Sequence, residues 1–238
     1  MFELMVCANG RILKPELLNS APPDERRGNL RDLVRINRWL GGRFIFRGLL
    51  ARIADPSEPL SILDVGAASG DTGAAIRRSH PRATVTSLDC RISHLEAAAG
   101  PRIVADAFHL PFPQKSFDVV YCSLFLHHFA DAEVVELLRT FWARARRAVV
   151  VIDLERKPYG YYFLPLTRPL FGWQPITVHD GCVSVEAGFR ADELHRLARD
   201  AGLPGVRVRR HLPWCRLSLV ASVFKENGWS RRTIKNAR

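Results

Sequence analysis

The strongest constraint on the fold is a regular alternation of short apolar runs and helical patterns that begins at Ser61. Runs rich in β-branched residues predict strands, and apolar positions three and four residues apart predict helices. The expected strands are 61–65, 84–88, 103–105, 117–122, 148–153, 206–210 and 216–223. The helices expected between them are 70–79, 92–99, 131–145 (with Asp131 as its N-cap) and 191–201. This order predicts an α/β fold, with a mostly parallel sheet covered by helices on both faces.

An acidic residue stands at the end of each of the first three expected strands. The first strand runs into Asp64-Val65-Gly66-Ala67-Ala68-Ser69-Gly70, whose glycines permit a tight turn and close approach of the backbone to a ligand. Asp89 follows the second strand and Asp106 the third. The carboxyl ends of parallel strands form a ligand crevice, and a carboxylate after the second strand can accept both hydroxyls of a ribose. Taken singly, the glycine turn could serve packing alone, Asp89 could be a helix N-cap and Asp106 could be a turn residue.

Together these segments resemble the class I S-adenosylmethionine-dependent methyltransferases. Residues 64–70 are similar to the first motif of that family, D-x-G-x-G-x-G, with Ala68 in place of the middle glycine. The segments Asp106-Ala107, Leu110-Pro111-Phe112-Pro113 and Ser116-Phe117-Asp118-Val119-Val120 resemble the type 11 methyltransferase domain. Ubiquinone/menaquinone C-methyltransferases and natural-product methyltransferases of secondary metabolism share that domain. The resemblance implies a Rossmann-like sheet of seven strands, the last antiparallel, with an N-terminal helical cap and a lid insertion after the fifth strand.

The resemblance also implies S-adenosylmethionine as cofactor and assigns residues to it. The methionine portion falls to Asp64 and the backbone of the following turn, and the ribose hydroxyls fall to Asp89. Cys90 flanks the adenine, Asp106-Ala107 contacts its edge, and Ser123 lies beneath the sulfonium. The expected cofactor-binding residues are Asp64, Gly66, Ala67, Gly70, Asp89, Cys90, Asp106, Ala107 and Ser123.

Two histidines are candidates for the base that takes a proton from the methyl acceptor. His127 follows the fourth expected strand, at the mouth of the crevice, and histidine titrates near neutral pH. Its alternative role is to hold the start of the next helix, which is the role we favour for His128. His179-Asp180, in the lid, could form a base with its orienting acid.

The lid insertion, about residues 157–190, is rich in aromatic side chains. They include Tyr159, Tyr161, Tyr162, Phe163, Phe171 and Trp173. An aromatic loop over a crevice favours an apolar or aromatic acceptor, although the same side chains could simply cap the sheet.

The chain divides into an N-terminal helical cap region at 1–56, a methyltransferase domain at 57–224 and a basic tail at 225–238. Within the cap region, residues 1–28 have an irregular pattern, and helices are expected at 30–40 and 43–53. Asn37 lies on an otherwise apolar helix face, so it needs a partner if it is buried.

The formal net charge is +11. An arginine-biased genome explains it, and attraction to nucleic acid or an anionic membrane is the alternative. We find no Asn-Pro-Pro-aromatic or Pro-Cys motif, so nucleic acid is not expected, while peripheral membrane contact stays open.

No apolar run approaches the roughly 18–20 residues of a membrane span. The start of the chain is a poor secretory signal. Five cysteines without CxxC spacing indicate a reducing compartment, hence the cytoplasm, and no metal site.

The sequence thus predicts methylation of a small apolar or aromatic acceptor, such as a phenol, quinone or polyketide-like molecule, at oxygen or carbon. A nucleic-acid methyltransferase and a non-catalytic, cofactor-binding relative are the alternatives. A nicotinamide oxidoreductase is disfavoured by the unmatched G-x-G-x-x-G pattern and by Asp106. The oligomeric state is not predicted.

Overall fold

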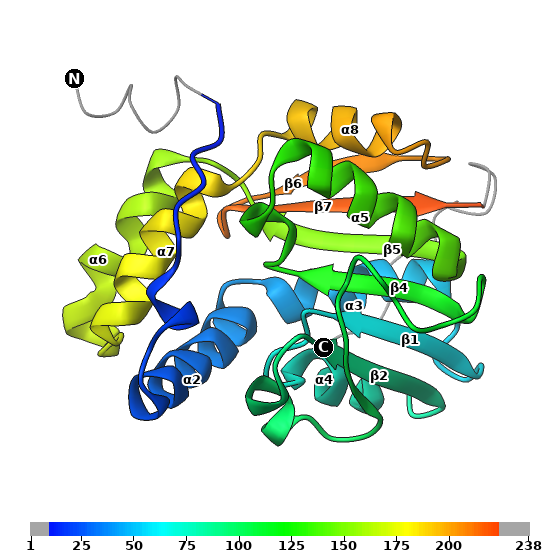
Figure 1. The fold of residues 1–238 in the computed structure, drawn as a ribbon, viewed down its shortest axis with the longest axis horizontal. Helices are drawn as coiled ribbons and strands as arrows, with labels where there is room; N and C mark the ends of the chain where they lie inside the picture. The colour runs from blue at the N-terminus through cyan, green and yellow to red at the C-terminus, as the bar shows by residue number, and fades with distance from the viewer. Residues whose placement is uncertain (1–9, 224–238) are drawn as a thin grey trace, which may run out of the picture.

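The computed structural model describes residues 10–223, and its centre is a seven-stranded sheet (Figure 1). The strands are β1 (Leu60–Val65), β2 (Ala83–Asp89), β3 (Arg102–Val104), β4 (Phe117–Ser123), β5 (Ala145–Leu154), β6 (Arg207–His211) and β7 (Arg216–Ser222). Their order is β3-β2-β1-β4-β5-β7-β6. Strands β1 to β5 are parallel, and β7 is antiparallel to both of its neighbours. This confirms the predicted sheet, including its antiparallel last strand.

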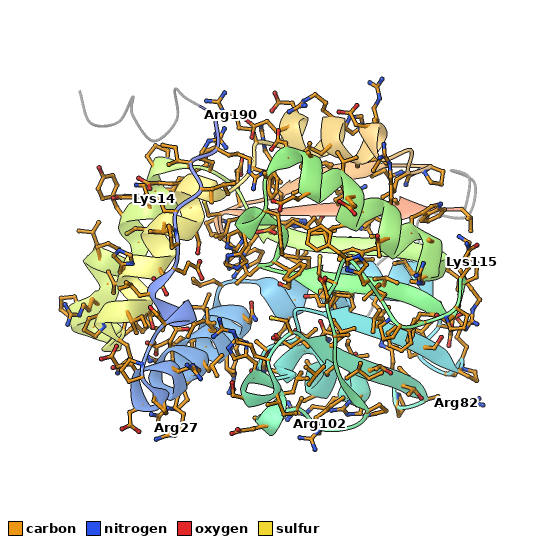
Figure 2. All side chains as sticks on the ribbon, viewed as in Figure 1. Lys14, Arg27, Arg82, Arg102, Lys115 and Arg190 are labelled. Atoms are coloured by element: carbon orange, nitrogen blue, oxygen red, sulfur yellow. The ribbon has the colours of Figure 1, made fainter. Side chains whose placement is uncertain are left out.

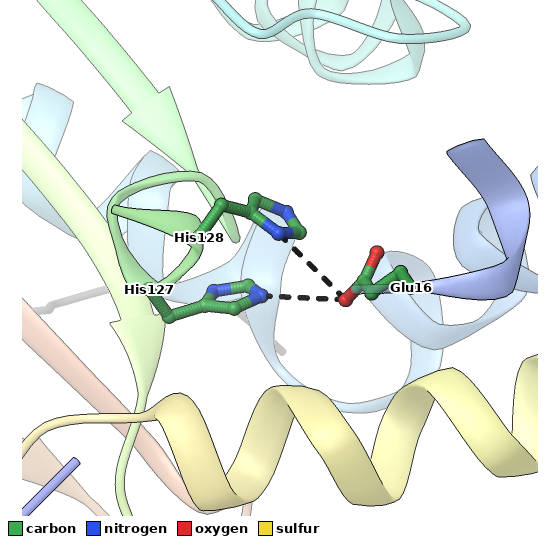
Figure 3. Close-up of side chains that lie close together, drawn as sticks. All are labelled: Glu16, His127 and His128. Atoms are coloured by element: carbon green, nitrogen blue, oxygen red, sulfur yellow. Dashed lines mark ion pairs between the residues drawn. The ribbon is translucent and has the colours of Figure 1, made fainter. Parts of the chain in front are cut away.

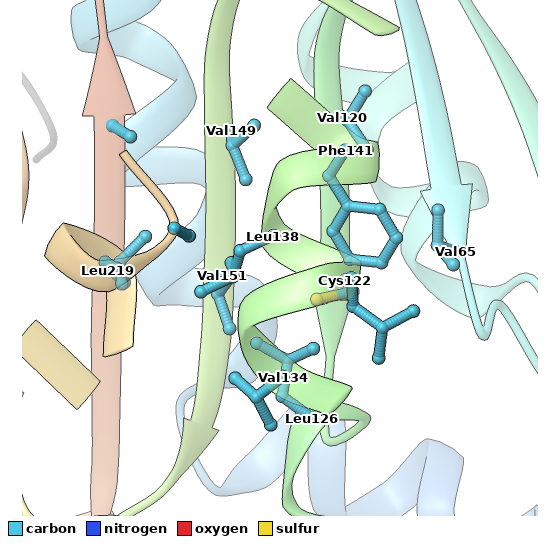
Figure 4. Close-up of a cluster of buried hydrophobic side chains, with 14 of the residues drawn as sticks. Val65, Val120, Cys122, Leu126, Val134, Leu138, Phe141, Val149, Val151 and Leu219 are labelled. Carbon is cyan, nitrogen blue, oxygen red and sulfur yellow. The ribbon is translucent and has the colours of Figure 1, made fainter. Parts of the chain in front are cut away.

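Helices cover both faces of the sheet (Figure 1). On one face lie α3 (Gly42–Ile53) and α4 (Asp71–Ser79), and on the other lie α5 (Asp131–Arg144) and α8 (Ala191–Asp200). Figure 4 shows the α5 side, where Phe141 and other α5 residues pack on the sheet.

Strand β5 shows why its sequence is a continuous apolar run. Val149 and Val151 belong to the core under α5, while Val150 and Ile152 belong to the core under α3. All four are fully buried. Successive side chains of a strand point to opposite faces, so a strand covered on both sides needs apolar residues at every position. Burying each one contributes about 1.5–3 kcal/mol.

Three helices form a separate layer beyond the carboxyl ends of β1, β4 and β5 (Figure 1). They are α2 (Pro23–Trp39), α6 (Pro158–Phe171) and α7 (Pro175–Ala187), and we call them the roof. A small core of its own joins Ile36 of α2 to Leu164 of α6 and to Trp173. Helix α2 of the expected cap region therefore packs with the lid helices in one layer, while α3 of the same region covers the sheet.

Two sequence expectations about the roof are wrong. The lid insertion is helical rather than a loop, because Pro158 and Pro175 each occupy a first turn, where no amide hydrogen is needed. Helix α2 begins at Pro23, seven residues before the expected start, for the same reason. Asp24 and Glu25 in its first turn favour this start through the helix dipole.

Two smaller boundaries also differ from expectation. Asp131 is the first residue of α5 and Ala130 is its N-cap, with the Glu133 carboxylate accepting the Ala130 N–H at 2.7 Å. The helix expected at 92–99 is a 3-10 helix, η2, over Ile92–Ala97.

Residues 11–18, which we call the strap, run along α7 before α2 begins (Figure 1). The Ile12 amide donates to the Glu186 carbonyl at 3.2 Å. At the far end the amides of Leu17 and Leu18, in η1 (Leu17–Asn19), donate to the Asp180 carboxylate at 2.9 and 3.0 Å. The strap thereby carries residues from the beginning of the chain to the ends of the strands.

Candidate active site

A cavity of about 1160 Å³ lies between the carboxyl ends of the strands and the roof. Its walls come from the turns after β1 to β4, the strap, the three roof helices and the turn between β6 and β7. The expected site residues that line it are Asp64, Gly66, Ala67, Asp89, Cys90, Asp106, Ala107, Ser123 and His127. Gly70 and His179 do not line it. The volume exceeds that of a pocket for one drug-sized ligand, so two ligands can occupy it together.

The turn after β1 depends on glycine at two positions. Gly66 has a φ of 66°, and a Cβ there would lie 2.4 Å from the Phe125 ring. Gly70 has a φ of 64° and stands against Ala98. Ala68, at the family's middle glycine, also adopts a left-handed φ, of 45°. Its amide donates to Asp89 Oδ2 at 3.1 Å, which holds the turn against the end of β2 despite the strain.

Asp64 is a buried acid with an unsatisfied oxygen. The residue is 3% exposed, and its Oδ2 finds no hydrogen-bond partner within residues 10–223. Burial raises the pKa of Asp64 well above its usual range, and the nearby Asp71 and Asp89 raise it further. The side chain is therefore suited to a cationic ligand group.

Asp89 and Asp106 are ionised acceptors at the ends of β2 and β3. Burial opposes ionisation of Asp89, but contact with His94 and the amides of Arg91 and Ala68 lowers its pKa overall. A hydrogen bond from His109, at 2.8 Å, lowers the pKa of the more exposed Asp106.

On the other side of the cavity, Asp153 organises the turn after β4. It lies near the end of β5 and is fully buried. Its Oδ2 accepts the backbone amides of Phe125, Leu126 and His127 at 2.9–3.3 Å. Its Oδ1 lies 2.7 Å from His127 Nδ1. Burial opposes its ionisation, yet the charge of His127 keeps the pKa of Asp153 below its usual range.

His127 is 3% exposed and stands between the carboxylates of Asp153 and Glu16, of which Figure 3 shows Glu16. Its Nε2 lies 3.9 Å from Glu16 Oε1 and has no hydrogen-bond partner among the described residues. Burial lowers its basicity, but Asp153 and Glu16 outweigh that and raise the pKa of His127 to about 9. Burial likewise opposes ionisation of Glu16, but the two histidines and Ser184 lower its pKa to about 2.

His128 stands beside His127 but behaves differently. Its Nδ1 lies 3.8 Å from the same Glu16 oxygen, and its side chain is 37% exposed on the cavity wall. The protein around the ring and the charge of His127 lower the pKa of His128 to about 4. It is neutral over most of the physiological range.

The structure does not bring His179 to this cluster. Its side chain is 48% exposed, and its Nδ1 contacts Asp180 at 2.9 Å. Asp180 in turn accepts the strap amides, so this pair ties the strap to α7.

Three residues of the site were missed at the sequence level. Glu16 comes from a segment without a pattern, and no sequence signal marks it. Asp153 is the last residue of an expected strand, and Asp64 stands one residue before the end of another. This shared position could have marked Asp153 as a site residue. Arg216 lines the cavity at 1% exposure, and its Nε and Nη1 lack an acceptor in the part of the chain that the structure describes.

Other sequence expectations concern membranes and thiols. Among the described residues, no helix is long and apolar enough to cross a membrane. Cys90, Cys122, Cys182 and Cys215 are free thiols. Cys7 and the basic tail lie outside the described residues.

Known proteins share part of this sequence and its fold. Residues 62–148 match the family model described as a methyltransferase domain. The chain is 31% identical over 99 residues to a demethylmenaquinone methyltransferase of Thermotoga maritima, covering 39% of this chain and 43% of the relative. It is 36% identical over 96 residues to a ubiquinone/menaquinone biosynthesis C-methyltransferase of Desulfotalea psychrophila, covering 37% and 39%. The chain thus spans about two fifths of the length of the curated relatives it matches.

Solved structures share the fold at low identity. The plantazolicin methyltransferase BpumL, in complex with SAH, has a TM-score of 0.66 at 15% identity, covering 87% of this chain and 93% of that one. A crystal structure of a Nostoc punctiforme protein, proposed to be an O-methyltransferase, has a TM-score of 0.57 at 23% identity. The match covers 76% of this chain and 56% of that one. These likenesses establish a Rossmann-like class I methyltransferase fold.

Proposed function

Because the chain carries a methyltransferase domain of the class I, S-adenosylmethionine-dependent family, we propose that it transfers a methyl group from S-adenosylmethionine to a small acceptor. The acceptor is apolar or aromatic and carries an acidic oxygen, as in a phenol, a quinone-related or a polyketide-like molecule. Methylation is at oxygen or carbon. One observation carries the proposal: a single cavity joins the three strand-end acids to the His127–Asp153 pair.

The residues present fit a cationic nucleoside cofactor. A buried acid with an unsatisfied oxygen, Asp64, gains a counter-ion from a ligand with an amino group and a sulfonium. Asp89 and Asp106 are ionised acceptors for ribose hydroxyls and an adenine amine, and Cys90 and Ala107 line the same wall. When bound, the cofactor supplies a methyl group activated by a positively charged sulfur.

Asn37 supports the same assignment from the roof. Its Oδ1 is buried without a partner among the residues described, and the residue lines the cavity, where its side chain hydrogen-bonds to Asp71. The sequence left open whether its partner is cofactor, acceptor or a loop carbonyl. We assign it to the cofactor, because its neighbour Asp71 follows the cofactor turn directly.

The protein's work in methyl transfer is to align the acceptor and to exclude water. The roof closes the cavity over the strand ends and supplies apolar walls from Trp39, Phe163 and Leu164. Such walls hold an aromatic acceptor, and the roof disfavours a nucleic-acid substrate.

His127 is the base in this proposal. The acceptor hydroxyl gives its proton to the neutral Nε2, while Asp153 holds the opposite nitrogen and stabilises the imidazolium that forms. Since the two carboxylates raise the pKa of His127 to about 9, the neutral form becomes more abundant as the pH rises toward 9. Turnover should therefore increase over that interval.

Arg216 supports an acceptor with an acidic oxygen. A buried guanidinium with two nitrogens that lack an acceptor is costly, and an anionic oxygen in the cavity would accept from them. Arg216→Met should therefore raise KM for an anionic acceptor more than for a neutral one. We also propose a cytoplasmic location, because scattered free thiols suit a reducing compartment.

The proposal is tested by incubating the purified chain with S-adenosylmethionine and a panel of phenols, hydroquinones and enols, with mass spectrometry of the products. We expect methylated product from the wild type and roughly 10²–10⁴-fold less from His127→Ala. Cofactor binding without methylation of any acceptor would favour a non-catalytic relative.

A further inference from the structure

We propose that Glu16, His127 and His128 form a binding site for a divalent transition-metal ion of the zinc type, beside the methyl acceptor. The proposal rests on the proposed function only for the role of the ion, and not for its binding. It differs from the expectation drawn from the sequence, in which the cysteine spacing indicated no metal site.

The three side chains already converge on one point. Their ligand atoms, Glu16 Oε, His127 Nε2 and His128 Nδ1, all lie within 4.8 Å of one another (Figure 3). Zinc binds such atoms at about 2.0–2.2 Å, so neighbouring ligands of a tetrahedral ion lie about 3.4 Å apart. The separations of Glu16 Oε1 from the two histidine nitrogens, 3.9 and 3.8 Å, are slightly longer than that. Small inward movements of Glu16 and of the exposed His128 ring would close the three ligands around one ion.

The buried histidine is held as a metal ligand would be. His127 is 97% buried, and its Nε2 faces Glu16 without a hydrogen-bond partner in the described part of the chain. Its Nδ1 contacts the Asp153 carboxylate at 2.7 Å. A carboxylate on the second nitrogen of a ligating histidine sets the tautomer and orients the ring. Asp153 is itself fixed by three backbone amides, so this outer contact is rigid.

The carboxylate ligand is oriented in a similar way. Ser184 Oγ, from α7, donates to Glu16 Oε1 at 2.5 Å, and this is the oxygen that faces both histidine nitrogens. The strap that carries Glu16 is anchored on both sides of it, by Arg11 to the Ala187 carbonyl and by Leu17 to Asp180.

Two imidazoles and one carboxylate are the ligand set of catalytic zinc sites that keep a fourth position for water or substrate. All three residues line the cavity, so the open position faces the acceptor space. An acceptor hydroxyl bound there would lose its proton to solvent, and its oxygen would be presented for methylation as an anion. This mode excludes the histidine base, because the same Nε2 lone pair takes either a proton or the metal.

The test is a calorimetric titration of the chelator-treated 238-residue chain with Zn²⁺, followed by substitution with Co²⁺ and measurement of visible absorption. We expect one ion per chain and the d–d bands of a four-coordinate cobalt site. His128→Ala and Glu16→Gln should each weaken binding by at least about 100-fold, and Asp153→Asn by about 10–100-fold. His179→Ala is the matched control, because His179 also pairs with an aspartate but does not line the cavity, and this variant should bind as the wild type does.

His128→Ala and Glu16→Gln leave the His127–Asp153 contact intact, and a native circular dichroism spectrum confirms that they fold. Absence of stoichiometric binding, or equal binding by wild type and both variants, overturns the proposal. S-adenosylmethionine titrated into the same metal-free protein separates the two hypotheses. Cofactor binding without zinc binding refutes the metal site alone, and zinc binding without cofactor binding refutes the proposed function alone.

Discussion

The two halves of the cavity are built in different ways. The half that we propose for the cofactor, around Asp64, Asp89 and Asp106, takes each of these residues from the end of a strand, and β1, β2 and β3 are neighbours in the sheet. The half that we propose for the acceptor, around Glu16 and His127, joins side chains more than a hundred residues apart in the chain. The first half is encoded locally by strand–turn–helix sequence, and the second exists only after the strap and roof have packed.

Because of this difference, a substitution in one half should leave the function of the other half unchanged. Substitutions in the cofactor half should change cofactor affinity, and those in the acceptor half should change turnover while leaving cofactor affinity intact. Each experiment below either separates the halves or shows that they are one unit.

The largest effect is expected from His127→Ala. Loss of the group beside the acceptor should lower turnover by roughly 10²–10⁴-fold, whether it acts as base or as metal ligand. The Kd for S-adenosylmethionine should stay within about twofold, since His127 is on the acceptor side. Steady-state turnover and calorimetry on the same preparation measure both, with His179→Ala as the control. A large loss of cofactor affinity in His127→Ala would show that the halves are coupled.

The pH dependence of stability tests the acceptor half without any substrate. With a folded pKa of about 9 against an ordinary value of 6.5, His127 binds its proton more tightly in the native state. Its contribution is fully present below pH 6.5 and is lost as the pH rises through 9. The loss should be about 3 kcal/mol by urea denaturation, and it should be absent from His127→Gln. Parallel pH profiles for the two proteins would contradict the charge arrangement around His127.

Asp89→Ala tests the cofactor half. It removes a carboxylate proposed to accept from ribose hydroxyls, and bonds to a charged acceptor are worth about 1.5–3 kcal/mol each. Calorimetry should show S-adenosylmethionine binding weakened by roughly 100-fold. Unchanged affinity in a folded Asp89→Ala protein would remove the ribose assignment.

A smaller effect is expected where the strap is anchored. Arg11 donates to the carbonyls of His127, Phe129 and Ala187 and pairs with Asp131 at 2.7 Å. Arg11→Ala should lower the free energy of unfolding by about 1–2 kcal/mol, because buried acceptors are left unpaired. KM for the acceptor should rise severalfold while cofactor affinity is retained. Arg11→Lys should restore part of the stability through the ion pair with Asp131.

Most residues of the proposed cofactor half line the cavity as the sequence predicted, and there is a physical reason for this. Strand ends and glycine turns leave a local pattern, and a parallel sheet brings successive strand ends to one edge. Gly66 illustrates this. Its left-handed φ and its closeness to the Phe125 ring both require glycine, and a short sequence motif therefore marks the position. The seven strands and their order of appearance follow from the same local signals.

The acceptor half could be predicted only in part. His127 was identified by its place after a strand, but its partner Glu16 comes from a segment with no periodic pattern. His179 was a reasonable candidate from its neighbour Asp180, yet helix α7 directs that pair to the strap. Contacts of this kind depend on tertiary packing between the cap and the lid, which no local pattern specifies.

The most direct test of the account is the affinity of S-adenosylmethionine for Asp64→Asn, measured by calorimetry beside the wild type and His127→Ala. Asparagine keeps the size of the side chain and removes the charge that a cationic cofactor would neutralise. The account predicts one-to-one binding to the wild type, roughly tenfold or weaker binding to Asp64→Asn, and unchanged binding to His127→Ala. Equal affinity of Asp64→Asn and wild type, or no binding to the wild type at all, would contradict it.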